Sequence, residues 1–257
     1  MKKVTIIKVG GAVVESPDSL EAFLNNFVHI EGAKILVHGG GRSATAMAER
    51  LQIPTKMVDG RRVTDENMLE IVTMVYGGLV NKNIVAKLQC KKLNALGLTG
   101  ADMNLIEAHK RPVKDVDYGF VGDIDRINTD ALMALISQGI TPVVAPLTHD
   151  LKGNLLNTNA DTIAASLAVG LSAECDVDLY YGFEKNGVLK DANDDHSVIT
   201  SMTTRDFEIL KTSGAIHSGM IPKLTNCFDA IAQGVRRVYI GHVDNINHLD
   251  RGTHLHD

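Results

Sequence analysis

The chain of 257 residues is poor in cysteine, with only Cys90, Cys175 and Cys227, which lie far apart. No two of them form a CxxC pair, so the sequence indicates neither a zinc ribbon nor a dithiol redox motif. Such sparse, odd usage is typical of a reducing compartment, and we expect a cytoplasmic protein. The start, Met1-Lys2-Lys3, leads directly into a strand-like run without a signal-peptide cleavage pattern.

Long apolar runs and an excess of basic residues are also missing. No apolar run approaches the roughly 20 residues that span a bilayer, so we expect no membrane partner. Lys and Arg number 26 against 31 Asp and Glu, which leaves a net charge of -5 with neutral histidines. Without a basic excess, nucleic acid is not expected as a partner. The 44% of hydrophobic residues suffices for a substantial core.

Several common motifs for binding phosphate or activating a nucleophile are absent from the sequence. It contains no GxxxxGK[ST], no GxGxxG after the first apolar run and no GxSxG. The HRD and DFG motifs of protein kinases are missing as well. These absences argue against P-loop nucleotidases, dinucleotide-binding enzymes, α/β hydrolases and protein kinases. Any phosphate site here must use a different loop.

Two glycine clusters, each at the end of a short apolar run, are the most informative features present. They lie in the segments Val4–Gly11 and Lys34–Gly41. β-Branched runs that end in glycine indicate buried strands of a parallel sheet. Consecutive glycines let backbone N–H groups approach an anion closely. Lys8 lies within the first run and would be costly to bury without an anionic partner, so we expect phosphoryl chemistry there.

Strand-like and helix-like segments alternate along the whole chain, without a linker or a shift in composition. This alternation predicts an α/β fold, a three-layer αβα sandwich with a mostly parallel central sheet and two lobes. We expect one domain over 1–257, with lobes at 1–172 and 173–257. The predicted strands are 4–9, 35–37, 105–108, 119–124, 141–146, 178–181 and 235–240. The predicted helices begin near 16 and span 43–51, 64–95 (interrupted at Gly77-Gly78), 130–138, 161–169, 203–210 and 223–233.

Three further segments carry polar groups that have two interpretations each. Arg62 precedes a helix start and could form a fork onto a carboxylate, or belong to a solvated turn. Asn157, Asn159 and Asp161 could bind a ligand or cap the following helix. Lys223 lies just inside another helix start and could be catalytic or simply exposed. Each segment in isolation leaves both interpretations open.

In their order and spacing, these segments resemble the amino acid kinase family over nearly the whole chain. Within it, the resemblance is closest to the branch that phosphorylates N-acetyl-L-glutamate in arginine biosynthesis. The matching segments are Lys8–Gly11 (KxGG), His38–Gly41 (HGGG), Gly60–Thr64 (GxRVT), Gly78–Lys82 (GxxNK), Gly97–Asp102, Gly119–Gly122, Asn157–Asp161 (NxNAD) and Gly219–Lys223 (GMxxK).

The resemblance implies an ATP-dependent kinase that phosphorylates the γ-carboxylate of N-acetyl-L-glutamate, with Mg²⁺ carried by the ATP. Such a carboxylate is already ionised at neutral pH, so the reaction requires no general base. The alternatives are an N-succinylglutamate kinase, another member of the family, or a catalytically weak nucleotide-binding regulatory module. The resemblance also implies a homodimer. Because Lys8 lies so close to Met1, we expect no feedback inhibition by arginine.

The resemblance assigns roles to individual residues. Lys8 and Lys223 would contact the transferred phosphoryl group, and Asp161 would hold the two lysines in position. The acyl amino acid would be bound by Gly40, Gly41, Arg62, Asn157 and Asn159. ATP would be bound by Lys8, Gly10, Gly11, Glu184, Gly187, Gly219, Met220 and Lys223.

The sequence departs from the family pattern in its second half. Where the family has [ST]-D-V-x-G, this chain has Phe183-Glu184-Lys185-Asn186-Gly187, so that Phe183 replaces a hydroxyl residue and Glu184 an aspartate. Four histidines, at positions 242, 248, 254 and 256, lie near the carboxyl end. They could bind a metal, but we expect a flexible polar tail there.

Overall fold

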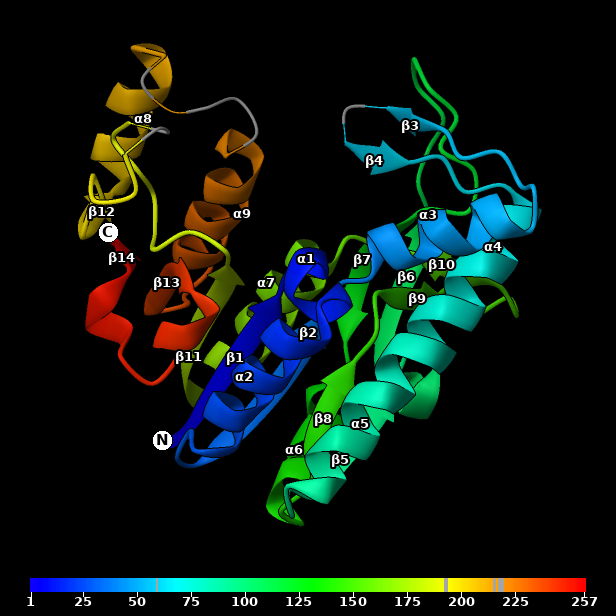
Figure 1. Cartoon of the computed structure of the whole chain (residues 1–257), viewed down its shortest axis with the longest axis horizontal. Coiled ribbons are helices and arrows are strands. Elements are labelled where there is room, and N and C mark those ends of the chain that lie inside the picture. Colours follow the sequence, from blue (N-terminus) through cyan, green and yellow to red (C-terminus); the bar gives the residue numbers. More distant parts are fainter. Residues whose placement is uncertain (59, 192–193, 215, 217–219) are drawn as a thin grey trace.

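A central sheet of eight strands forms the middle layer of the molecule, in a computed structural model that describes residues 1–58, 60–191, 194–214, 216 and 220–257. The strand order is β12-β14-β13-β11-β1-β2-β8-β5 (Figure 1). The strands are β1 (Lys2–Val9), β2 (Ala33–His38), β5 (Ala95–Leu98), β8 (Thr141–Val144), β11 (Cys175–Phe183), β12 (Ser201–Thr203), β13 (Arg237–His242) and β14 (Thr253–His256).

All neighbouring strands of this sheet run parallel except β13 and β14, which are antiparallel. The predicted mostly parallel sheet is therefore confirmed. Strand β1 is central, and its alternate residues enter two different cores: Val4 and Ile6 pack on one face, Ile7 and Val9 on the other. Burial on both faces explains why this strand is a continuous apolar run rather than an alternating one.

Helices cover both faces of the sheet, which confirms the three-layer αβα arrangement (Figure 1). Ser16 caps the helix that was predicted to begin there, accepting a hydrogen bond from the Ser19 N–H. One face packs against α6 (Thr129–Ser137), α7 (Ala160–Ser172), α8 (Thr204–Thr212) and α9 (Ile221–Ala232). The other packs against α1 (Gly11–Glu15), α2 (Pro17–Val28), α3 (Gly41–Arg50), α4 (Glu66–Val72) and α5 (Asn81–Cys90).

The long helix predicted over 64–95 is present but ends earlier. It consists of α4, a π-helical segment η1 (Thr73–Val80) and α5. The predicted interruption at Gly77-Gly78 is thus a stretch of π-helix rather than a kink. The last predicted residue, Ala95, instead begins β5, because this segment pairs with β8 at the sheet edge.

A smaller sheet lies beyond the carboxyl ends of the central strands. Its order is β10-β9-β6-β7, and β6 and β7, near the strands predicted at 105–108 and 119–124, pair as an antiparallel hairpin. The two-stranded ribbon β3–β4 projects beyond α3 and α4 (Figure 1). The bounds are β3 (Met57–Val58), β4 (Arg61–Arg62), β6 (Ile106–Lys110), β7 (Gly122–Ile127), β9 (Leu147–His149) and β10 (Leu155–Asn157), with 3₁₀ turns η2 (Asp102–Asn104), η3 (Val243–Asn245) and η4 (Leu249–Arg251).

The carboxyl-terminal segment is not the flexible tail that we expected. It forms β14, an interior strand between β12 and β13, in which Thr253 and Leu255 are fully buried. His254 stacks on Tyr239 with ring centroids 4.9 Å apart. Within the described residues, no three His, Cys, Asp or Glu side chains gather as a metal site would require. In the same residues, no helix is long and apolar enough to cross a membrane.

Candidate active site

The two glycine clusters meet at the carboxyl edge of the central sheet. β1 and β2 are adjacent and parallel, so the loops that follow them leave from the same edge. They touch through bare backbone: a Cβ on Gly39 would lie 3.1 Å from the Gly11 nitrogen. Gly11 and Gly41 begin α1 and α3, where the first amide groups lack partners within the helix. The Gly10 N–H, by contrast, donates to the Gly182 carbonyl at 3.3 Å.

Lys8 has an anionic partner, as its position within an apolar strand requires. Its Nζ lies 2.8 Å from Asp161 Oδ1, and the two side chains are only 10% and 12% exposed. Asp161 lies in the first turn of α7, which packs against β1. The N-cap Asn159 accepts hydrogen bonds from the N–H groups of Asp161 and Thr162. The chain therefore buries this ion pair at the start of a capped helix.

Lys223 lies near the same pair but is held differently. No carboxylate of the described residues lies within 4.0 Å of its ammonium, whose Nζ is 4.1 Å from the centre of the Phe183 ring. Burial lowers the pKa of Lys223 and the nearby Lys8 lowers it further, whereas Asp161 raises it. Asp161 thus pairs directly with Lys8 and acts on Lys223 through its charge alone.

Beside the glycine loops lies a cavity of about 220 Å³. Arg62, which is 8% exposed, donates from Nη2 to the Gly41 carbonyl and to Thr45 Oγ1, both at 2.8 Å. Among the described residues, none offers a carboxylate within ion-pair distance of this guanidinium. The cavity is lined by Gly39, Gly40, Gly41, Met57, Gly60, Arg61, Arg62, Tyr76, Arg111, Val121, Gly122, Pro146, Asn157, Thr158, Asn159, Ala160 and Thr162.

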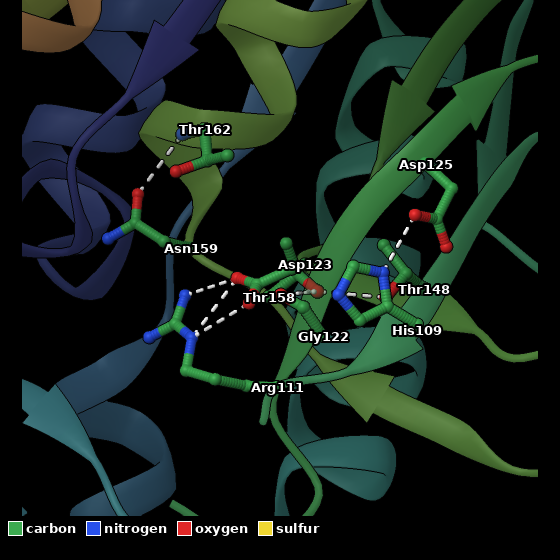
Figure 2. A network of polar contacts seen from close by, with 9 residues as sticks. All are labelled: His109, Arg111, Gly122, Asp123, Asp125, Thr148, Thr158, Asn159 and Thr162. Carbon is green, nitrogen blue, oxygen red and sulfur yellow. Dashed lines mark hydrogen bonds and ion pairs between the residues drawn. The ribbon is translucent and has the colours of Figure 1, made fainter. Parts of the chain in front are cut away.

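Asn157 and Asn159 both line this cavity, and both also have structural partners. Asn157 ends β10 and donates from Nδ2 to Thr64 Oγ1 at 2.9 Å. The amide oxygen of Asn159 accepts hydrogen bonds at the start of α7, and Figure 2 shows the one that the Thr162 N–H donates. The helix-capping interpretation of this segment is therefore correct for Asn159, alongside its place in the cavity wall.

The β6–β7 hairpin adds Arg111 and its partner Asp123, two residues that the sequence pattern did not single out. Arg111, directly after β6, donates from Nε to both Asp123 carboxylate oxygens at 3.1 and 3.2 Å. Its Nη1 is buried and has no hydrogen-bond partner in the part of the chain that the structure describes, and Figure 2 shows this nitrogen turned away from Asp123. No motif flags Arg111, because only the hairpin pairing brings it to the cavity. The adjacent Thr148 and Thr158 hydroxyls are hydrogen-bonded at 2.8 Å.

His38 explains why a histidine precedes the triple glycine. It is fully buried, and its Nδ1 lies 2.7 Å from the Gly39 carbonyl while its Nε2 lies 3.1 Å from Asn81 Nδ2. Burial lowers its pKa to about 4, so the ring is neutral near pH 7. A neutral ring protonated at Nδ1 donates to Gly39 and accepts from Asn81. The GxxNK segment thus supports the glycine loop, with Lys82 bonded to the Asn81 side-chain oxygen.

Three of the residues predicted to bind the nucleotide, Glu184, Gly187 and Met220, are not among the described residues that line this cavity. Glu184 is exposed just after β11, and Gly187 is buried against Thr253 of β14. Met220 is the N-cap residue of α9. Gly219 lies outside the described residues.

Comparison with known proteins agrees with this geometry. The model of the amino acid kinase family matches residues 3–242. The chain belongs to the amino acid kinase family. Among similar members, the acetylglutamate kinase of Bacteroides fragilis is 58% identical, with 99% of this chain and 97% of that protein covered. The acetylglutamate kinase of Parabacteroides distasonis is 56% identical, with 99% and 100% covered.

Solved structures share the amino acid kinase fold. The protein smu.665 from Streptococcus mutans UA159 has a TM-score of 0.81 and 28% identity, with 98% of each chain covered. N-acetylglutamate synthase from Neisseria gonorrhoeae has a TM-score of 0.83 and 20% identity, covering 99% of this chain and 59% of that one. The second likeness concerns the fold alone.

Proposed function

We propose that this amino acid kinase is an acetylglutamate kinase, which transfers the γ-phosphoryl group of ATP to the γ-carboxylate of N-acetyl-L-glutamate in arginine biosynthesis. The full-length acetylglutamate kinase relatives support this reaction. One structural observation carries the assignment: the buried Arg62 lacks a carboxylate partner among the described residues and lines the cavity beside the glycine loops. A substrate carboxylate would satisfy it with charge-assisted hydrogen bonds.

The chemical difficulty of this reaction is to bring two anions together. The attacking carboxylate is ionised at neutral pH and needs no base. Lys8 and Lys223 would neutralise charge on the transferred phosphoryl group, as preorganised donors do in a poorly solvated site. Asp161 keeps Lys8 in place, since its carboxylate is already engaged by that lysine at 2.8 Å. Mg²⁺ bound to the ATP phosphates would supply further charge neutralisation.

The cavity suits an acylated amino acid better than a free one. Arg62 would hold the α-carboxylate, while Gly40, Gly41, Asn157 and Asn159 would contact the remaining polar groups. Among the described residues that line the cavity, none is an aspartate or glutamate. A free α-ammonium would therefore lack an anionic partner among these residues, whereas an acylated nitrogen carries no charge. This argues against a glutamate or aspartate kinase.

A second candidate substrate is N-succinyl-L-glutamate, which carries one more carboxylate. An N-succinyl group calls for another cation in the acyl pocket, and both Arg61 and Arg111 line the cavity in addition to Arg62. Arg111 forms an ion pair with Asp123, and among the described residues its buried Nη1 has no hydrogen-bond partner. A second ligand carboxylate would give this nitrogen a partner, which supports N-succinyl-L-glutamate as the second candidate.

An ADP-release assay with N-acetylglutamate, N-succinylglutamate, glutamate and aspartate tests these proposals. We expect turnover with one or both acylated substrates and none with the free amino acids. An Arg111→Met variant distinguishes the two candidates, because it should raise the KM of the succinyl substrate far more than that of the acetyl one. Absence of turnover with every substrate would favour a nucleotide-binding regulatory module instead.

We also propose a division of labour between the lobes. Residues 1–172 would bind the acyl amino acid and residues 173–257 the nucleotide. In support, the described residues that line the cavity all lie between Gly39 and Thr162. The free thiols of Cys90, Cys175 and Cys227 fit a reducing cytoplasm, where we place the enzyme.

A homodimer is part of the proposal and would form along the η1 segment. Met74 and Leu79 on this segment are 52% and 49% exposed, and Gly78 leaves open space above the backbone. Burial of such apolar side chains favours association. Light scattering should show a dimer that Leu79→Asp dissociates, whereas Ile209→Asp, at an equally exposed position on α8, should leave it intact.

A further inference from the structure

Phe183 lies beneath both lysines of the proposed phosphoryl site. It is the last residue of β11, at the carboxyl edge of the central sheet. Its ring centre is 4.1 Å from Lys223 Nζ and 5.3 Å from Lys8 Nζ. An ammonium within about 6 Å of an aromatic centroid is attracted by the negative face of the ring. One ring therefore contacts both cations.

The two lysines depend on this ring to different degrees. Lys8 has a close anionic partner in Asp161, whereas Lys223 has no carboxylate within 4.0 Å among the described residues. The groups that face Lys223 are Asp161 from α7, Lys8 from β1 and the Cys227 thiol from its own helix. Lys8 repels the Lys223 ammonium, whereas the face of Phe183 contacts it directly and stabilises it as a cation.

The ring is itself held in place by the same group of residues. Phe183 stacks on Tyr181, with centroids 6.5 Å apart and planes 11° from parallel. The Tyr181 hydroxyl donates to the Asp161 backbone carbonyl at 3.1 Å. The ring and the carboxylate that pairs with Lys8 thus belong to one packed unit.

We propose that Phe183 is a positioning residue, whose ring face holds Lys223, and to a smaller extent Lys8, charged and aligned at the phosphoryl site before nucleotide binds. The role in phosphoryl transfer rests on the proposed function, whereas the contact between ring and lysines does not. Two separate measurements therefore test the proposal.

The first measurement needs no activity. Acylation of Lys223 in the free protein is followed against pH by peptide mass spectrometry, with exposed Lys152 as the internal standard. Phe183→Leu keeps apolar bulk but removes the ring face, so the half-reaction pH of Lys223 should fall by about 0.5–1 unit. Phe183→Tyr retains a ring and should restore the wild-type value. An unchanged titration in Phe183→Leu overturns the proposal.

The second measurement is kinetic. Phe183→Leu should lower kcat by about 3- to 30-fold with little change in the acylglutamate KM, and Phe183→Tyr should restore kcat. A loss confined to the KM of ATP would mean that the ring contacts nucleotide instead, and would also overturn the proposal. If the wild-type protein phosphorylates no acylglutamate, the proposed function fails, while the Lys223 titration still decides the role of Phe183.

Discussion

The buried ion pair between Lys8 and Asp161 yields the sharpest prediction, because it links stability to catalysis. The two side chains are 10% and 12% exposed and 2.8 Å apart. Lys8→Met would leave the Asp161 carboxylate buried without its partner. Removing one member of such a pair costs about 3–5 kcal/mol of unfolding free energy. At the lower end, a chain of this size should lose roughly 6–12 °C in Tm.

The double variant Lys8→Met/Asp161→Asn separates the two effects. It removes both charges, so we expect it to recover most of the unfolding free energy that Lys8→Met loses. Its kcat should nevertheless stay about 100-fold or more below wild type, since a preorganised cation is gone.

Urea denaturation and steady-state kinetics on the same preparations check this prediction. Lys185→Met is the matched control, because the ion pair of Lys185 with Asp195 is 52% and 60% exposed. Exposed pairs contribute about 0–1 kcal/mol, so this variant should change stability little. The reasoning is refuted if Lys8→Met costs no more than the control, or if the double variant is no more stable than Lys8→Met. Wild-type kcat in Lys8→Met would remove that lysine from the phosphoryl site.

Three further predictions concern other parts of the site. Arg62→Lys should raise the acyl-amino-acid KM about tenfold or more with a smaller change in kcat, because the planar fork is lost; an unchanged KM would exclude Arg62 from carboxylate binding. In urea denaturation, Gly119→Ala should lower the free energy of unfolding far more than Gly139→Ala. Both glycines have φ near +70°, but a Cβ at Gly119 would lie 2.2 Å from a backbone oxygen, whereas a Cβ at Gly139 would meet open space. Because burial lowers the pKa of His38 to about 4, the unfolded state binds the proton first as the pH falls. The free energy of unfolding should therefore decrease by about 3 kcal/mol between about pH 6.5 and about pH 4. The variant His38→Gln should show a smaller decrease over the same range.

Local patterns determined much of the fold. The apolar run at 4–9 predicts a strand that is buried on both faces, and Ser16 predicts a helix start that the structure caps as expected. The prediction of a flexible tail at the carboxyl end was wrong, because the polar residues of that segment are typical of an exposed tail. There, alternate residues such as Thr253 and Leu255 are buried by neighbouring strands, and a strand so short gives too weak a periodic signal by itself.

The sequence by itself also determined the family, because the order and spacing of Lys8, the glycine clusters, Asp161 and Lys223 distinguish it. Only the tertiary structure decided how these residues act on one another. It pairs Asp161 with one lysine rather than both, and it brings Phe183 beneath Lys223. It also turns Arg111 into the cavity through a hairpin. Such contacts join residues that are distant in the chain, so no local pattern encodes them.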